Sequence, residues 1–274
     1  MNGVLADRVL GTRVFQARED EPTALLISDL HVPADGGVVL SWLRAVLAAA
    51  RRLQARVHVL GDLFDSYVTP RQVKTGVWGE VAEMFAAAAA GGVAIDCLHG
   101  NRDFLLGPEF VAASRARIVA GGLRGRIGGV DTLLLHGDEL CQNDLPYQRA
   151  KRWLRHPATR WLARALPVGI ALRVAEHARR KSRMVIAAGN QQRFLPTAAA
   201  IEAAFGTGAS RLVFGHIHRH CHGSHRGGDY WVLPAFDASG VGLLASPSGI
   251  GPVRCHDSGE IEPLPVPPPC PFAS

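Results

Sequence analysis

The sequence predicts an α/β fold built around a largely parallel sheet. Short runs of Val, Ile and Leu alternate with helical segments between residues 23 and 135, which is the pattern of βαβ units. Several of these runs end in Asp, Asn or His, and ligands of parallel sheets bind at the carboxyl ends of the strands. Late in the chain, short strands with Gly and Pro turns predict a second sheet packed on the first.

The elements of the first half follow from the spacing of apolar residues. Uninterrupted β-branched and Leu runs predict strands at 23–28, 56–60, 93–98, 118–119, 126–127 and 131–135. Ala and Leu at helical spacing predict helices at 38–53, 77–90 and 108–115.

The second half begins with a long helical segment, residues 144–182, which Pro157 and Pro167 interrupt. A helix from Pro196 to Phe205 and strands at 211–214, 230–233, 240–245 and 253–256 are expected to follow. Three further histidines, His220, His222 and His225, are expected in a turn beyond strand 211–214, outside any metal site. The Pro-rich end of the chain is expected to be extended or disordered.

Composition and cysteine count narrow the class of protein to which this chain can belong. The chain of 274 residues contains no apolar run of about twenty residues, so no membrane-spanning helix is expected. No basic patch followed by an apolar stretch opens the chain, so no secretory signal is expected. The five cysteines form no CxxC pair, so neither a disulfide framework nor a zinc knuckle is indicated, and a reducing cytoplasm is the default location.

The positive charge is concentrated in one segment. The formal net charge is +6, yet residues 144–183 hold eleven Lys or Arg and two Asp or Glu. Such a segment either meets an anionic partner or is an ordinary solvated basic face. Its apolar stripe consists of Leu154, Ala158, Trp161, Leu162 and Ala165, and its basic face of Arg149, Arg152, Arg160 and Arg164. This pattern predicts amphipathic helices that lie on a membrane surface or pack on the domain itself, and no nucleic-acid-binding module is recognisable.

Seven side chains at five strand ends are candidate metal ligands. They are Asp29, His31, Asp62, Asn101, His136, His216 and His218. Two divalent ions about 4 Å apart need six or seven N or O donors and one bridging carboxylate, for which Asp62 is the candidate. Mixed imidazole and carboxylate donors favour Mn, Fe or Zn over Ca or Mg. Behind the ligands, Asp65 and Asp138 are expected to orient loops or imidazoles, and His58 and His99 to lie in the core or beside the ligands.

Three of these strand ends resemble the calcineurin-like metallophosphoesterases, and in particular the branch that hydrolyses UDP-2,3-diacylglucosamine in lipid A synthesis. The similar stretches are GDLFD at 61–65, GNRDFLLG at 100–107 and HGDELC at 136–141, and the resemblance extends from Ser28 to His218. It implies a four-layer α/β/β/α sandwich with a helical cap insertion. The expected units are a core of 1–143 and 184–262, a basic helical cap of 144–183 and a Pro-rich tail of 263–274.

The resemblance also implies a reaction. A metal-activated water would attack the α-phosphorus of UDP-2,3-diacylglucosamine and give UMP and 2,3-diacylglucosamine 1-phosphate. One ion would be held by Asp29, His31, Asp62 and His218, and the other by Asp62, Asn101, His136 and His216. The branch implies Mn²⁺, a lipid-linked UDP-sugar as substrate, and a peripheral position at the anionic cytoplasmic face of the inner membrane.

Asn101, Arg102 and Asp62 are the candidate catalytic residues. Many relatives place a histidine after the asparagine, where it can protonate an alkoxide leaving group. A guanidinium cannot act as a general acid, so Arg102 favours a leaving group that needs no proton, such as a phosphate monoester. The alternative is that Arg102 is an ordinary surface arginine.

Substrate contacts are expected from both the core and the cap. The candidates are Asn101, Arg102, Asp144, Tyr147, Lys181, Ser182 and His216. In the family the cap holds two acyl chains and supplies a serine and a lysine, for which Lys181 and Ser182 are the candidates. The polar tract after Ser182 is shorter here than in the family, which puts the nucleoside and sugar contacts in question but not the metal site.

Two other functions fit parts of the sequence. One is a metallophosphoesterase that acts on a soluble nucleotide or dinucleotide, and the Trp-bearing cap speaks against it. The other is a non-catalytic scaffold that keeps the fold. Scaffolds of this kind usually lose metal ligands, and none of the seven is missing here.

Overall fold

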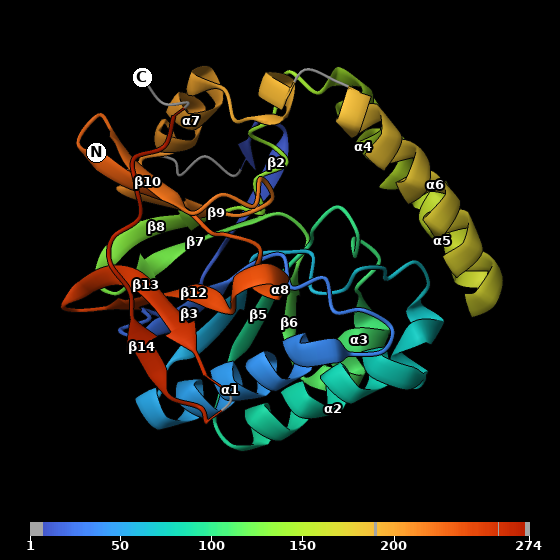
Figure 1. Cartoon of the computed structure of the whole chain (residues 1–274), viewed down its shortest axis with the longest axis horizontal. Coiled ribbons are helices and arrows are strands. Elements are labelled where there is room, and N and C mark those ends of the chain that lie inside the picture. Colours follow the sequence, from blue (N-terminus) through green and yellow to red (C-terminus); the bar gives the residue numbers. More distant parts are fainter. Residues whose placement is uncertain (1–7, 189–190, 257, 272–274) are drawn as a thin grey trace.

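Two seven-stranded sheets lie face to face, and helices cover the outer face of each (Figure 1). This arrangement confirms the expected four-layer α/β/β/α sandwich. The computed structural model describes residues 8–188, 191–256 and 258–271, without the side chains of residues 160, 178, 179, 181–188 and 191.

The first sheet is built on the parallel strands of the first half. Its strands, in spatial order, are β14 (Ile261–Pro263), β13 (Gly249–Cys255), β12 (Val241–Ser246), β3 (Ala24–Ile27), β4 (Arg56–Val59), β5 (Ile95–Leu98) and β6 (Arg117–Val119). Strands β3 to β6 are parallel, and the other three are antiparallel. The helices on its outer face are α1 (Gly37–Leu53), η1 (Pro70–Lys74), α2 (Gly76–Ala90) and α3 (Pro108–Ser114).

The second sheet combines the middle and the late strands of the chain. Its strands, in spatial order, are β1 (Arg8–Val9), β2 (Thr12–Gln16), β7 (Gly122–Ile127), β8 (Val130–Leu134), β9 (Arg211–Phe214), β11 (Gly228–Val232) and β10 (Cys221–His225). Helix α7 (Ala198–Phe205) covers its outer face, and η2 (Gln191–Phe194) and α8 (Phe236–Ser239) lie in connections. The expected elements are therefore present, with ends that shift by a few residues.

Three apolar layers fill the spaces between the four structural layers. Leu25 and Val57 face α1, whereas Leu26 and Leu60 face the second sheet, because successive side chains of a strand point to opposite faces. Ile201 of α7 packs with Leu212 of β9 on the far side. The parallel strands are buried on both faces, which explains their uninterrupted apolar runs.

The segment between residues 144 and 188 forms three helices at one side of the molecule (Figure 1). They are α4 (Leu145–Leu154), α5 (Pro157–Ala165) and α6 (Val168–Ala188). The breaks fall at Pro157 and Pro167, as the sequence predicts. None of the described helices is both long and apolar enough to cross a membrane.

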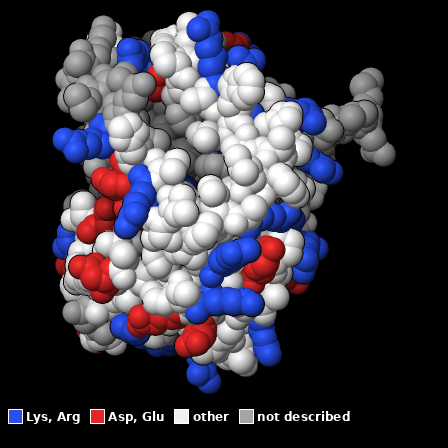
Figure 2. Space-filling view, turned by 90° about the vertical axis from the view of Figure 1, so that its right-hand side faces the viewer, with Lys and Arg blue, Asp and Glu red and all other residues white. Residues whose placement is uncertain are grey.

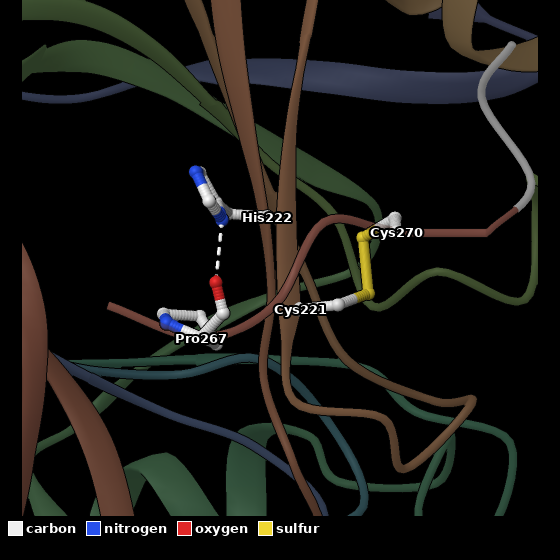
Figure 3. The surroundings of a disulfide bond; sticks show 4 residues. All are labelled: Cys221, His222, Pro267 and Cys270. Carbon is white, nitrogen blue, oxygen red and sulfur yellow. Dashed lines mark hydrogen bonds between the residues drawn. A yellow bond between two sulfur atoms is a disulfide. The ribbon is translucent and has the colours of Figure 1, made fainter. Parts of the chain in front are cut away.

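The end of the chain corrects one expectation and agrees with another. The cysteine spacing indicated no disulfide, yet Cys221 of β10 and Cys270 of the Pro-rich tail form one (Figure 3). The tail runs beside β10: the N–H of His222 donates to Pro268 O, and that of Cys270 to His222 O. This part of the tail is therefore extended, one of the two states expected. A pairing across 49 residues depends on the tertiary path of the tail, which local spacing does not reveal.

The same region corrects a second expectation. His222 and His225 lie on β10 and not in a turn, because Cys221–His225 pairs antiparallel with Gly228–Val232. The His222 ring also hydrogen bonds Pro267 O at 2.8 Å (Figure 3). A hairpin with polar residues on both strands has no apolar alternation, so its sequence resembles that of a loop.

A buried charged network lies between the sheets, away from the strand ends. His58 is fully buried and faces Glu21 with one ring nitrogen and Asp96 with the other. The guanidinium of Arg56 lies 3.2 Å from both carboxylates. Although these side chains are close enough to chelate a cation, Arg56 and Arg117, whose Nε lies 4.0 Å from Asp96, already supply two positive charges opposite the two carboxylates, so the cluster is an ion network of the core.

Candidate metal centre

The carboxyl ends of five strands meet at one edge of the sandwich. Strands β3, β4 and β5 of one sheet and β8 and β9 of the other end there, and each is followed by one or two of the seven candidate ligands. Asp29, Asp62 and His136 are almost completely buried, and His31 is 7% exposed. The structure therefore brings the seven predicted side chains together.

One group of side chains surrounds Asp29. His218 Nε2 lies 3.3 Å and His31 Nε2 3.9 Å from Asp29 Oδ1. His31 Nε2 is also 3.4 Å from Asp62 Oδ2, so Asp62 borders this group. Asp29, His31 and His218 present ligand atoms within 4.8 Å of one another, a spacing that one metal ion can span.

A second group lies on the other side of Asp62. His136 Nε2 is 3.8 Å from Asp62 Oδ1 and 3.0 Å from Asn101 Oδ1. His216 Nδ1 is 3.2 Å from the same asparagine oxygen. One oxygen of Asp62 faces each group of side chains. This carboxylate is therefore placed to bridge two metal ions, one in each group.

Two glycines allow the loops to approach one another this closely. A Cβ atom on Gly100 would lie 2.0 Å from Asp62 Oδ1, and one on Gly215 would lie 2.4 Å from Asp29 Oδ2. Any side chain at either position would displace a candidate ligand. The glycines before Asn101 and His216 are thus part of the site.

The backbone at the site is held in an unfavourable conformation. Nine non-glycine residues of the described chain have positive φ, and five of them are Asp29, His31, Asp62, His216 and His218, with φ between 41° and 67°. Such conformations cost about 1–3 kcal/mol each and cluster at functional sites. Here they turn the side chains back across the strand ends.

Hydrogen bonds fix the imidazole orientations. His31 Nδ1 donates to Asp237 Oδ2 at 3.0 Å, and His136 Nδ1 donates to Leu60 O at 2.8 Å. Each bond leaves Nε2 free to face the carboxylates, which is how proteins orient histidine ligands. Asp237, on α8, was not among the predicted residues, because no pattern around Phe236–Ser239 marks it.

Asp103 holds two of the ligand loops together. Its fully buried carboxylate accepts the N–H of Leu63 at 2.7 Å and that of Gly100 at 2.9 Å. Burial and the charge of Asp62 raise the pKa of Asp103 to about 7. Asp103 belongs to the motif GNRDFLLG at 100–107, which the sequence shows. The motif alone does not show that Asp103 joins two ligand loops.

Charges shift the titration of the histidines in the metal-free protein. Burial alone would lower the pKa of His31, but the hydrogen bond to Asp237 and the charge of Asp62 raise it to about 9. Burial likewise opposes protonation of His136, yet Asp62 and Asp29 raise its pKa to about 9. Burial and the charge of His136 lower the pKa of His216 to about 4.

The donor set fits divalent metal ions. Asp29 Oδ1 and His31 Nε2 are buried and have no hydrogen-bond partner in the described chain. Buried oxygen and nitrogen atoms normally have hydrogen-bond partners. A bound cation would be the partner of these two atoms. Imidazole nitrogens with carboxylate and amide oxygens are the ligands of Mn, Fe and Zn.

Arg102 lies at the edge of the group. Its Nη1 is 2.7 Å from Asp65 Oδ1, and its Nε is 3.5 Å from Asp62 Oδ2. The backbone N–H of Arg102 donates to Asp62 Oδ1. The side chain is 30% exposed and is held by carboxylates, which orients its guanidinium at the centre.

One of the four candidate substrate residues between positions 144 and 183, Tyr147, lies beside the candidate ligands. The Tyr147 ring lies 6.2 Å from that of His216, and Asp144 begins α4 by accepting the N–H of Tyr147. Lys181 and Ser182 belong to α6, but their side chains lie outside the described part of the structure. Their role stays a prediction.

Several known proteins with similar sequences carry the same name. A protein of Ralstonia nicotianae named UDP-2,3-diacylglucosamine hydrolase is 33% identical over 225 residues, which cover 77% of this chain and 82% of its own. Proteins of the same name from Pseudomonas aeruginosa and Azotobacter vinelandii are 32% and 31% identical, each over 72% of this chain and 82% of their own.

The other comparisons add little. No family model matches the chain. Among solved structures, Vacuolar Protein Sorting 29 from Cryptosporidium parvum aligns over 90% of this chain and 97% of its own at 14% identity, with a TM-score of 0.42. That score is too low to carry an argument. The sequence relatives decide the assignment: this chain belongs to the UDP-2,3-diacylglucosamine hydrolase family.

Proposed function

We propose that the protein hydrolyses the pyrophosphate bond of UDP-2,3-diacylglucosamine and releases UMP and 2,3-diacylglucosamine 1-phosphate. The name of its relatives supports this substrate. The observation that carries the chemistry is the pair of ligand groups on either side of Asp62, with unpartnered buried atoms in one of them.

The proposed cofactors are two divalent ions, and the proposed metal is Mn²⁺. Asp29, His31, Asp62 and His218 would hold one, and Asp62, Asn101, His136 and His216 the other. Metals bound there would lower the pKa of water and offset the charge of the phosphate oxygens. The polypeptide contributes the orientation of the ligands, through Asp237, Leu60 O and Asp103.

Asn101 and Arg102 are proposed to bind the reacting phosphate. The Asn101 amide faces the ligand group, and the guanidinium of Arg102 offers paired donors to phosphate oxygens. Because Arg102 cannot donate a proton as an acid, the leaving group must depart as a stable anion. A sugar 1-phosphate meets this requirement, whereas a simple alkoxide does not.

Residues 144–183 are proposed to be a cap insertion that binds the lipid part of the substrate and rests on an anionic membrane surface. Their large apolar side chains are exposed: Trp153 is 77% exposed and Trp161 71%. The others with more than a third of their surface exposed are Leu145, Leu154, Leu162, Ile170 and Val174. Figure 2 views the side of the molecule on which α5 and α6 lie, and it shows a broad uncharged area bordered by Lys and Arg, with Asp and Glu beside them on the left and below.

This exposed face favours a lipid substrate over a soluble nucleotide. Exposed apolar patches on soluble proteins mark binding sites for apolar partners, and a basic border suits anionic lipid. The protein would then sit peripherally on the cytoplasmic face of the inner membrane. Similar turnover of UDP-2,3-diacylglucosamine and UDP-GlcNAc would contradict this part of the proposal.

The reaction itself is tested by oxygen labelling. The protein is incubated with UDP-2,3-diacylglucosamine and Mn²⁺ in ¹⁸O-water, and the products are analysed by ³¹P NMR. Attack on the α-phosphorus places the label in UMP. Label only in the lipid phosphate would refute the proposed point of attack.

A further inference from the structure

The first helix of the cap is attached to the core by polar contacts. Helix α4 buries none of its residues, although Trp153 and Leu154 belong to it. Its contacts with the core come instead from polar side chains. Gln148 Nε2, for example, donates to Asp138 O at 2.8 Å and to Cys141 O at 3.3 Å.

Two α4 side chains and that of Arg155, the residue directly after the helix, converge on one carboxylate. Lys151 Nζ lies 2.8 Å from Asp138 Oδ2, the Tyr147 hydroxyl donates to the same oxygen, and Arg155 Nη2 lies 3.9 Å from it. The spacing of four residues places these side chains on one face of the helix. Lys151 also lies 3.6 Å from Glu139 Oε1, and Arg155 Nη2 donates to Gly100 O at 3.4 Å.

Asp138 needs these partners because it is completely buried. A buried carboxylate needs positive charge close by, and Lys151 Nζ and Arg155 Nη2 lie 2.8 and 3.9 Å from Asp138 Oδ2. Removal of one partner from a buried ion pair is strongly destabilising, since it leaves the other charge uncompensated. Lys151 is 11% exposed and lies closest, so it is the main counter-charge.

We propose that Lys151 is a positioning residue that docks the cap onto the metal centre. By neutralising Asp138, it holds α4 against the loop that follows His136. Tyr147, in the first turn of the same helix, is thereby placed beside His216, and Asp144 caps that turn. The inference rests on the proposed function in one respect: the docked cap is expected to serve the diacyl substrate.

The main test compares Lys151→Met with Lys151→Arg, which keeps the charge. Lys74→Met is the matched control, because Lys74 is an exposed lysine of η1, outside residues 144–183. Each variant is loaded with Mn²⁺ and assayed with UDP-2,3-diacylglucosamine in detergent and with bis(4-nitrophenyl) phosphate, which has no acyl chain. Lys151→Met is expected to lose about 10- to 100-fold in kcat/KM on the diacyl substrate, mainly through KM, and to change less than about twofold on the small diester.

Lys151→Arg is expected to recover most of the diacyl activity, and Lys74→Met to behave as wild type. Equal activity of Lys151→Met and wild type on the diacyl substrate would overturn the proposal. Equal losses on both substrates would also overturn it, because Lys151 would then act through the metal centre. If Lys151→Met does not fold, Lys151→Gln takes its place with the same expectations.

A second readout does not depend on the substrate. Amide hydrogen exchange is measured in wild type and Lys151→Met, and faster exchange is expected in α4 with unchanged exchange in β8. Unchanged exchange in α4 would overturn the docking role. If wild type fails to hydrolyse the diacyl substrate, the proposed function fails, and the exchange experiment still decides the role of Lys151.

Discussion

At the scale of single residues, the site depends on side chains that the metal would not touch. Asp237 hydrogen bonds His31, and Ser28 Oγ and the N–H of His216 both donate to Asp29 Oδ2. These bonds hold the ligands in place on backbone that is itself unfavourable. Contacts within the protein therefore fix the orientation of these candidate ligands.

Replacement of Asp237 by Ala should weaken metal binding without removing a ligand. His31 would lose the bond that fixes its ring, and outer partners of this kind are worth about 10- to 100-fold in metal affinity. Calorimetric titration of the metal-free protein with Mn²⁺ measures the change. Asp35→Ala, at an exposed loop carboxylate, is the control. Equal affinity of Asp237→Ala and wild type would show that His31 is oriented by other contacts.

The candidate ligands could be predicted from sequence because each follows an apolar strand directly. The ends of parallel strands share one edge of a sheet, so a local pattern determines a spatial cluster. Asp237 could not be found in this way. It lies 206 residues from His31, on a four-residue helix without a motif, and only the tertiary fold brings the two together.

At the scale of secondary-structure elements, apolar periodicity located the helices and the buried strands and missed several short or polar strands. Strands β3, β5 and β9 are buried along their whole length, β4 is buried except at its first residue, and all four were predicted almost residue for residue. The short strands β1 and β2, at one side of the second sheet, and the edge strand β10, at the other, alternate little or carry polar residues on both faces. Their pairing is decided by neighbours that are distant in sequence.

The buried network on β4 and β5 should contribute more to stability than an exposed pair of the same kind. His58→Leu leaves Glu21 and Asp96 buried without one partner and is expected to destabilise the protein by about 1–3 kcal/mol. His256→Leu removes an exposed histidine–glutamate pair, to Glu262, and is expected to cost at most about 1 kcal/mol. Urea unfolding compares the two variants, and equal losses would show that the buried network has no special weight.

At the scale of the whole molecule, the centre couples metal binding to folding stability. In the metal-free protein the pKa of His31 and of His136 is about 9, above the unfolded value of 6.5. Both residues hold a proton in the folded state at a pH where the unfolded chain has released it. This contribution to stability is complete below pH 6.5 and is lost as the pH rises through 9.

The metal-free protein should therefore become less stable between pH 6.5 and 9. Bound metal requires neutral imidazoles, so Mn²⁺ should stabilise the protein increasingly over the same range. Thermal unfolding with a chelator and with Mn²⁺ measures both trends. Stability of the metal-free protein that rises across this range would contradict the proposed charge coupling.

The seven clustered side chains are proposed to form the metal centre at which the protein hydrolyses the lipid-linked pyrophosphate. The most direct measurement is turnover of UDP-2,3-diacylglucosamine by metal-free wild type and Asp62→Ala during titration with Mn²⁺. Wild type is expected to regain activity as two ions bind per chain. Asp62→Ala, which lacks the carboxylate between both ligand groups, should remain slower by about 10³-fold or more at saturating Mn²⁺. Full hydrolysis by Asp62→Ala would contradict the assignment of the site.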